Sequence, residues 1–331
     1  MSVITDLRPY LPGFALLGGG AALSVFLARQ VPGLQPLVVA VVVGAVVANT
    51  VGTPTVAEPG VGTAKLALET GIILLGAAVS VDEMLTAGPA VLGLVVVVVG
   101  GGLLLGETIT RRLFGIDGSA PSLLAAGASV CGVSAVVTVG RVVEARDAAL
   151  TFAAATVLLF DVVTLAAFPV AGEWLGLTSR QFGVWAGLSM YSTGPVAAAG
   201  FAVSPEAGQW ATVTKLARNS LLGAVAVVYS VAYASRSATE PGIRRLWAEF
   251  PKFLLGFLVV AVIANSGLLS AAALASITTV SDALFLLAFV GLGLSIRVGE
   301  LRTVGVTPVA ALLVHLLVVS ALTLTAVRLF L

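Results

Sequence analysis

The sequence predicts an all-α polytopic membrane protein, and three observations lead to this prediction. Hydrophobic residues make up 59% of the 331 residues and charged residues only 10%, whereas soluble domains carry about 25% charged residues. Uncharged runs of the length that a helix needs to cross a bilayer occur along the whole chain. Two of these runs are interrupted near the middle by glycine, serine, threonine or proline. The composition excludes an ordinary soluble domain.

Apolar runs between polar loops predict about eleven membrane helices. The first run follows Asp6 and Arg8 but leads directly into another span, so we expect a retained helix rather than a cleaved signal peptide. The polar stretch Ser235–Glu249 is expected to be a cytoplasmic loop, and residues 1–331 a single integral membrane domain. In chain order the expected spans are 12–28, 35–51, 66–81, 88–107, 120–142, 147–170, 180–202, 206–234, 250–267, 280–296 and 305–329.

Basic residues predict the orientation of the chain, because cytoplasmic loops carry an excess of lysine and arginine. Most of them fall in alternate loops, which predicts a cytoplasmic N-terminus and an external C-terminus. Arg141 and Arg146 lie in a loop of the opposite set and depart from the rule. The residues that follow the rule are Lys65, Arg111, Arg112, Arg180, Arg236, Arg244, Arg245, Lys252, Arg297 and Arg302.

Two distant stretches of the chain, about 35–105 and 251–325, resemble each other. Asn49 matches Asn265 and Glu83 matches Glu300, each among similarly spaced Val, Ala, Leu and Gly residues. The two copies start an odd number of predicted helices apart, so they would lie upside down relative to each other. Inverted repeats of this kind are typical of alternating-access carriers.

The two interrupted spans define a broken-helix core at about 118–234. Ser129–Ser134 interrupts the first span, and Ser192–Pro195 interrupts the second. Proline cannot donate a backbone hydrogen bond and glycine loosens a helix. In lipid the freed backbone groups must face protein or a wet cavity. A pair of interrupted spans is therefore a pointer to the binding site of a transporter, although a packing role for one break alone is the simpler interpretation.

Charged and hydroxyl side chains near these interruptions are the candidate site. Lys215 and Arg218 are three residues apart on one helix face and could attract an anion. Asp161 and Glu69 are candidate ion-coupling acids, and an alternative of nearly equal weight pairs one of them with Lys215 or Arg218 in a buried structural contact. The candidate substrate-binding residues are Ser129, Cys131, Gly132, Ser134, Ser192, Thr193, Gly194, Lys215 and Arg218.

This pattern predicts a secondary transporter that moves a small anion with H⁺ or Na⁺ across the bilayer. The first alternative is a cation/proton antiporter in which Asp161 and Glu69 contact the ion. The second alternative is a channel. We expect no enzyme, because Cys131 has no neighbouring base and His315 is expected to pack between helices. No cofactor or metal cluster is expected. A net charge of +1 gives no reason to expect binding to nucleic acid. The chain could act alone or as a homodimer.

A phosphate-binding loop is also rejected. Gly101–Thr108 reads G-x-x-x-x-G-E-T, with Glu107 where such a loop needs lysine.

With these residues in view, the chain resembles the sulfate exporter (YeiH-type) family of prokaryotic inner-membrane proteins over nearly its whole length. Ala126–Ala135 resembles that family's G-x-S-I-C-G-x-x-A segment, and Val196–Ser204 is similar to its V-V-A-A-G-x-A-x-S segment. Lys215–Arg218 matches K-x-x-R, and Gly71–Gly76 matches G-I-I-L-x-G. The resemblance implies a fold of the cation antiporter and bile-acid symporter type. In that fold a core domain with two crossed, broken helices works against a panel domain.

The chain departs from the family's pattern at four places. The family has His followed by an acidic residue at the positions of Tyr191-Ser192 in this chain. It has Ala-Gln at the positions of Gly194-Pro195. Glu69 stands in place of the family's arginine, and Asp161 in place of a small residue. We therefore expect the second interruption to determine this protein's own substrate, among sulfate-like, sulfonate and organic-acid anions.

Overall fold

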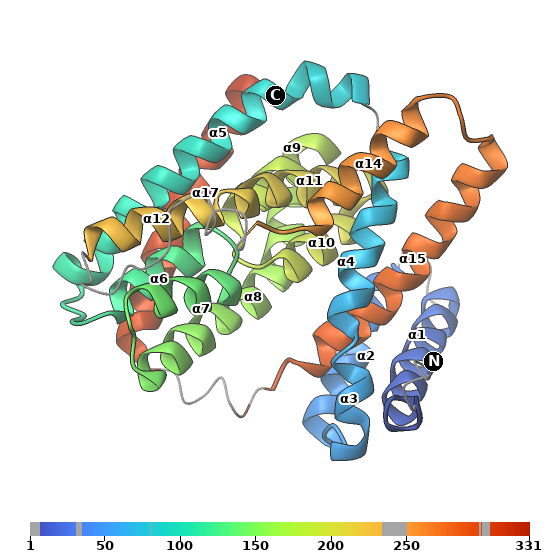
Figure 1. Cartoon of the computed structure of the whole chain (residues 1–331), viewed down its shortest axis with the longest axis horizontal. Coiled ribbons are helices and arrows are strands. Elements are labelled where there is room, and N and C mark those ends of the chain that lie inside the picture. The colour runs from blue at the N-terminus through green and yellow to red at the C-terminus, as the bar shows by residue number, and fades with distance from the viewer. Residues whose placement is uncertain (1–6, 31–34, 80, 234–249, 298, 300–304) are drawn as a thin grey trace, which may run out of the picture. The chain divides into compact units, whose positions relative to one another are not determined.

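The computed structural model describes residues 7–30, 35–79, 81–233, 250–297, 299 and 305–331, with the backbone alone over 81–87. Every regular element within these ranges is a helix, as the sequence predicts. The chain forms two compact units (Figure 1). One comprises Met1–Val81 with Phe253–Gly299, and the other Asp82–Lys252 with Glu300–Leu331. Each unit therefore combines segments that lie far apart in the sequence.

The first unit is organised around the long helix α15, which packs along both α2 and α4. Helix α14 lies against α4, and α1 lies against α2. Short 3₁₀ turns flank these helices: η1 (Arg8–Tyr10) precedes α1, η2 (Thr55–Ala57) precedes α3 and η3 (Gly76–Ala78) follows α4. The helices are α1 (Leu11–Gln30), α2 (Pro36–Thr50), α3 (Glu58–Val61), α4 (Ala64–Leu75), α14 (Phe253–Asn265) and α15 (Ala271–Leu294).

The two matching stretches exchange reciprocal contacts within this unit. Asn49 donates to the carbonyl of Ile296 at 2.7 Å, and its counterpart Asn265 donates to the carbonyl of Val79 at 2.9 Å. Each asparagine also donates to the carbonyl four residues before it. Each asparagine side chain thus links its own stretch to the other stretch. A twofold relation between two copies produces such paired contacts, because each contact made by one copy is repeated by the equivalent residues of the other.

Matching glycines form a second reciprocal contact. A Cβ on Gly76 would lie 3.1 Å from the backbone nitrogen of Ala261 and closer to the carbonyl of Phe257. A Cβ on Gly293 would lie 2.8 Å from the nitrogen of Ala45 and closer to the carbonyl of Val41. Small residues let membrane helices approach this closely. The reciprocal contacts support the predicted repeat, whereas the inverted orientation of its copies stays a prediction.

The second unit contains the broken helices. Helix α11 packs against both α9 and α10, and α8 packs against α6, α7 and α10. Helix α17 lies against α9 and also contacts α6 and α8. The elements are α5 (Val81–Thr108), the π-helical turn η4 (Ile109–Leu113), α6 (Ala120–Ser129), α7 (Val133–Val142), α8 (Asp147–Trp174), α9 (Ser179–Ser189), α10 (Thr193–Val203), α11 (Pro205–Ser220), α12 (Leu222–Ala232) and α17 (Val306–Phe330).

Each predicted span coincides with one helix or one pair of helices, with three differences. The expected span 88–107 starts earlier, because α5 begins at Val81. The expected span 206–234 is interrupted at Leu221, where α11 ends and α12 begins. The expected span 280–296 starts earlier, because Ser270 caps α15 by accepting a hydrogen bond from the backbone nitrogen of Ala273. The orientation of the termini stays a prediction, and the predicted loop Ser235–Glu249 lies outside the described residues.

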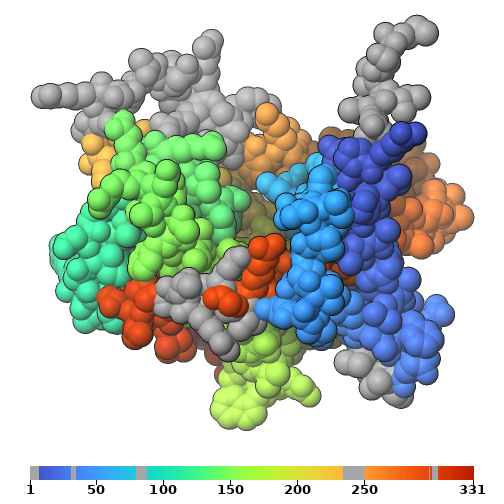
Figure 2. Space-filling view, turned by 90° about the horizontal axis from the view of Figure 1, so that it is seen from below, coloured from blue at the N-terminus to red at the C-terminus, as the bar shows by residue number. Residues whose placement is uncertain are grey.

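Among the described residues, six helical segments are long and apolar enough to cross a membrane, so the number of about eleven crossings stays a prediction. Large apolar side chains cover the outer surface of the long helices, as expected for contact with lipid tails; Val97, Leu104, Val170 and Leu322 are examples. Figure 2 shows part of the surface of the second unit, where α7 and α8 (green) lie. These six segments are 8–30, 55–78, 88–113, 147–174, 271–294 and 306–330.

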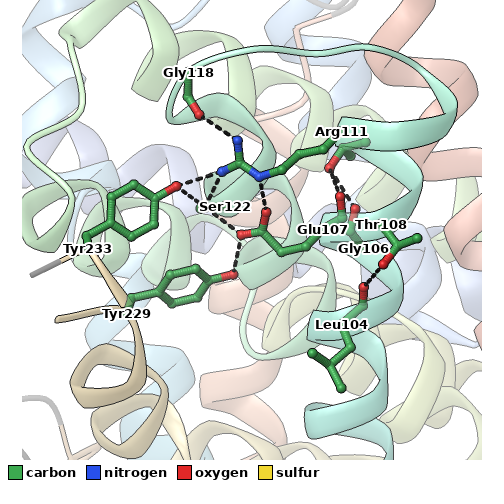
Figure 3. A network of polar contacts seen from close by, with 10 residues as sticks. Leu104, Gly106, Glu107, Thr108, Arg111, Gly118, Ser122, Tyr229 and Tyr233 are labelled. Carbon is green, nitrogen blue, oxygen red and sulfur yellow. Dashed lines mark hydrogen bonds and ion pairs between the residues drawn. The ribbon is translucent and has the colours of Figure 1, made fainter. Parts of the chain in front are cut away.

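A polar network ties α12 to α5 and to the first turn of α6 (Figure 3). The carboxylate of Glu107 accepts hydrogen bonds from Arg111, from the hydroxyl of Ser122 and, at 3.0 Å, from the hydroxyl of Tyr229. Arg111 also donates to the hydroxyl of Tyr233 at 2.6 Å. Glu107 therefore cross-links three helices. Since Gly101–Thr108 is continuous helix within α5, it forms no phosphate-binding loop, as predicted.

The reciprocal glycine contacts predict a strong effect of size at one position. Gly293→Val should lower the thermal stability of the detergent-purified protein, because its Cβ would meet backbone atoms that cannot rotate away. Overpacking typically costs about 1–3 kcal/mol. Gly18→Val in α1 is the matched control, since a Cβ there meets open space within the described residues. Equal melting temperatures for the two variants would contradict the close approach.

Candidate functional site

The two broken helices meet at their interruptions. Gly132 precedes α7, Ser192 precedes α10, and these two residues are in contact. A Cβ on Gly132 would lie 3.1 Å from the Cβ of Ser192 and closer still to its hydroxyl. Gly132 also has φ +69° and ψ −134°, a conformation that is essentially restricted to glycine. The two interruptions, separated by about sixty residues of sequence, therefore form one place in the second unit.

Lys215 of α11 binds the carboxyl-terminal ends of both broken helices. Its ammonium group donates to the carbonyl of Val130 after α6 at 2.8 Å and to the carbonyl of Met190 after α9 at 2.9 Å. The side chain is fully buried. The last carbonyls of a helix lack partners within it and carry partial negative charge. Lys215 satisfies two such carbonyls from two helices at once.

Arg218, one helical turn further along α11, does the same with more bonds. Its Nη2 and Nε donate to the carbonyls of Ala128 and Ser129 in α6, at 2.9 and 3.2 Å. Its Nη1 reaches three carbonyls near the end of α9, those of Gly187, Leu188 and Met190, at 2.6 to 3.0 Å. We call Lys215 and Arg218 together the carbonyl clamp. The clamp holds the two helix ends side by side.

Neither candidate acid forms an ion pair with the clamp. Among the described residues, the ion pairs within 4 Å are Lys65–Glu69 and Glu107–Arg111. Glu69 belongs to the first unit, where it lies 3.9 Å from Lys65 with 29% of its side chain exposed. Asp161 therefore makes no direct ion pair with the clamp, although it lies close enough to Lys215 to attract its charge. Backbone carbonyls accept the hydrogen bonds of the clamp instead.

Asp161 lies at the interruption in a different role. Its side chain is buried in α8, and Oδ1 accepts a hydrogen bond from the backbone N–H of Ser192 at 3.0 Å. A carboxylate near the start of a helix also interacts favourably with the positive end of the helix dipole. Asp161 thus positions the residue from which α10 begins.

The amino-terminal ends of α7 and α10 are the part of the site that remains open. Neither helix has a side-chain cap. Ser134 in the first turn of α7 is exposed, and Ser192, Thr193 and Gly194 are half-buried. The first N–H groups of a helix point outward without partners and make a ready anion site. We call this pair of adjoining helix starts the paired N-termini.

Two of the predicted site residues lie behind the paired N-termini. Ser129 and Cys131 are buried. The carbonyl of Ser129 accepts from Arg218, and its hydroxyl has no hydrogen-bond partner among the described residues. His315 contacts the carbonyl of Gly102 through Nε2 at 3.1 Å, in agreement with the predicted packing between helices. Ser134, Ser192, Thr193 and Gly194 are therefore the predicted residues that reach the open side.

Sequence reasoning missed Asn219. This residue lies directly after Arg218 in α11, and its Nδ2 donates to the hydroxyl of Thr193 in the first turn of α10 at 2.9 Å. The side chain is only 6% exposed. A signal was available, because an amide inside a membrane span next to two charged residues is unusual.

The geometry of the clamp predicts that Lys215 and Arg218 stabilise the folded protein and do not bind the substrate directly. Lys215→Met should lower thermal stability even without any anion present, because the buried carbonyl of Val130 loses its side-chain donor and that of Met190 keeps only Arg218. An unsatisfied buried group costs about 1–3 kcal/mol. Arg218→Lys should also be destabilising, since one ammonium group cannot reproduce the planar guanidinium fork. Thermal unfolding of the purified protein in detergent measures both.

Arg328→Met is the matched control, because Arg328 donates to a single carbonyl, that of Leu175, at an exposed helix end. Its melting temperature should stay near that of the unchanged protein. If Lys215→Met instead left stability intact and only weakened anion binding, Lys215 would be a ligand-binding residue as the sequence first indicated.

Comparison with known proteins identifies the family. Residues 12–312 match the family model described as "Conserved hypothetical protein 698". A "UPF0324 membrane protein" of Nitratidesulfovibrio vulgaris is 30% identical over 89% of this chain and 86% of its own length. A second, from Corynebacterium glutamicum, is 31% identical over 91% and 87%. "UPF0324 membrane protein TauZ" of Paracoccus denitrificans is 29% identical over 91% and 90%.

No solved structure matches. The names of these relatives mention neither a sulfate exporter nor a transporter superfamily, so that part of the resemblance stays a prediction. The family model covers most of the chain, and the relatives match along most of their own length. Their description as membrane proteins agrees with the apolar helices of the structure. The chain is a multi-pass membrane protein and belongs to the UPF0324 membrane protein family.

Proposed function

We propose that this protein is a secondary transporter that carries a small anion across the cytoplasmic membrane and binds it at the paired N-termini. The observation that carries this proposal is the contact between Gly132 and Ser192, which brings two uncapped helix starts together. Each helix start carries a positive partial charge equivalent to about half an elementary charge. Two of them side by side favour an anion more than one alone.

The surrounding side chains fit an oxyanion. The hydroxyls of Ser134 and Thr193 lie in the first turns of the two helices and can each donate a hydrogen bond, whereas the side chain of Ser192 is bonded to the carboxyl of Asp161. Lys215 and Arg218 lie behind them, buried and bonded to backbone carbonyls. Because these cations are bonded to carbonyls, they contribute to the electric potential of the site without needing to touch the ligand. This arrangement favours sulfate-like, sulfonate or organic-acid anions.

Transport, rather than static binding, is supported by the architecture. Interrupted membrane helices that meet at a polar site, together with internal repeats, are typical of alternating-access carriers. The reciprocal contacts of Asn49 and Asn265 support such a repeat. In our proposal the second unit acts as the core and the first as the panel, with H⁺ or Na⁺ as the coupling ion. The acids Asp161 and Glu69 are the coupling candidates.

The same acids define the second candidate function, a cation/proton antiporter. The observation that favours it is the buried carboxylate of Asp161 directly at the interruption. Against it, Asp161 already accepts the N–H of Ser192, and Glu69 is paired with Lys65. An antiporter site also needs oxygen ligands for a cation, whereas the paired N-termini present N–H groups. We therefore rank anion transport first.

Anion transport predicts uptake that depends on Gly132. Proteoliposomes with the full chain should accumulate at least one labelled anion from a panel of oxyanions, sulfonates and organic acids, driven by an ion gradient. Gly132→Ala should reduce this uptake at least about tenfold, since overpacking of ~1–3 kcal/mol would separate the two helix starts. Gly100→Ala in α5, where a Cβ meets open space, is the control and should retain uptake. Uptake of no anion in the panel would refute the proposal.

Asp161→Asn distinguishes the two candidate functions. Asparagine keeps an oxygen that can accept the N–H of Ser192, so the helix start stays in place while the charge is removed. We expect exchange of anion against anion to persist in this variant, because exchange needs no coupling ion. Loss of exchange together with loss of proton-driven Na⁺ flux in vesicles would instead favour the antiporter.

A further inference from the structure

Asn219 is a buried polar side chain beside the start of α10, and its hydrogen bonding is incomplete. One end of its planar amide, Nδ2, is held by the hydroxyl of Thr193 at 2.9 Å. The other end, Oδ1, is buried and has no hydrogen-bond partner among the described residues. A buried acceptor without a donor costs about 1–3 kcal/mol. A ligand that supplies the donor would remove this cost.

The position of Asn219 separates it from the other unsatisfied atoms of the described residues. Those atoms belong to Thr53, Ser129, Arg180, Thr214 and His315. The partner of Asn219, Thr193, is the first residue of α10 and lies half-buried at the paired N-termini. Since Oδ1 belongs to the same amide group as Nδ2, it is adjacent to the start of α10. The unsatisfied acceptor therefore lies next to the proposed anion site, within one amide group of the start of α10.

The acceptor oxygen of Asn219 beside the donors of the paired N-termini determines which ligand is complementary to the site. The N–H groups and hydroxyls of the paired N-termini bind negatively charged oxygens. A carbonyl oxygen beside them repels another bare oxygen but accepts a hydrogen bond from O–H or N–H. The complementary ligand carries both kinds of group, namely charged oxygens and one hydrogen-bond donor. Hydrogencarbonate, hydrogensulfite and hydroxy- or amino-substituted sulfonates have this form, whereas nitrate, acetate and unsubstituted sulfonates do not.

We infer that Asn219 determines specificity, selecting anions that carry an O–H or N–H group over anions of the same charge and shape that lack one. This inference rests on the proposed anion transport and names its substrate class. A site built to bond a substrate hydroxyl discriminates strongly against the analogue without it, because the buried acceptor is then left unpaired. The hydrogen bond between Nδ2 and Thr193 keeps the amide oriented for this role.

The test compares matched anion pairs on the full chain in proteoliposomes. Hydrogencarbonate and nitrate are both planar and singly charged near pH 8, and they differ in one O–H group. Glycolate and acetate, and hydroxyethanesulfonate and ethanesulfonate, differ in the same way. Each unlabelled anion competes against the labelled anion that the protein takes up. We expect the donor-bearing member of each pair to compete at least about tenfold better, as loss of one buried hydrogen-bond partner implies.

Three variants assign the effect to Asn219. Asn219→Leu keeps the size but has no polar atom, so the preference within each pair should disappear. Asn219→Asp keeps the acceptor and adds a negative charge, so the preference should persist while all anions compete more weakly. Ser220→Ala is the control, because the hydroxyl of Ser220 bonds only to the carbonyl of Ala217 in the described structure, and it should behave as the unchanged protein. Thermal unfolding verifies that each variant is folded.

The outcomes separate the two proposals. Uptake of no anion would refute anion transport and this inference with it. Uptake in which both members of each pair compete equally would overturn the inference alone, as would a preference for the members without a donor. If Asn219→Leu does not fold, Asn219→Asp decides: loss of the preference in that folded variant overturns the inference, and its persistence supports it.

Discussion

The arrangement of the second unit depends on one interaction, the bonding of two buried cations to backbone carbonyls. Lys215 and Arg218 donate only to carbonyls at the carboxyl-terminal ends of α6 and α9, in every hydrogen bond that the structure records for them. A helix that stops inside a membrane protein leaves carbonyls that cannot reach water. Two such ends without partners would be too costly to bury. The carbonyl clamp makes both interruptions compatible with a buried location.

The clamp also separates the negative ends of the broken helices, those of α6 and α9, from the positive ends, those of α7 and α10. Since it draws the negative ends of α6 and α9 toward α11, the positive ends of α7 and α10 adjoin each other through Gly132 and Ser192. The first ends are buried and bonded, and the second are half-buried and uncapped. Charge that attracts an anion is thus presented by the backbone, while the charged side chains act from behind. A site of this kind needs no mobile lysine or arginine.

The first unit obeys a different constraint, the close approach of backbones at glycine. Gly76 and Gly293 each bring a helix against the backbone of the opposite stretch, and the paired asparagines add a hydrogen bond across the same boundary. These contacts involve no charged side chain, and their polar members are the asparagines themselves. This close packing contrasts with the polar, interrupted helices of the second unit.

The sequence by itself determined the membrane class, the positions of nearly all helices and the two interruptions, because these follow from local hydropathy and from the backbone chemistry of glycine and proline. It also identified Lys215, Arg218 and Asp161 as unusual, because charges in membrane spans are rare. Only the tertiary structure decided their partners. Carbonyls carry no signal in a sequence, so the clamp could be mistaken for a ligand site, and Glu69 could be grouped with residues of another unit. The bonding of Asn219 was likewise decided by the tertiary structure, because its bond to Thr193 and its unpaired oxygen exist only once α10 and α11 are packed together.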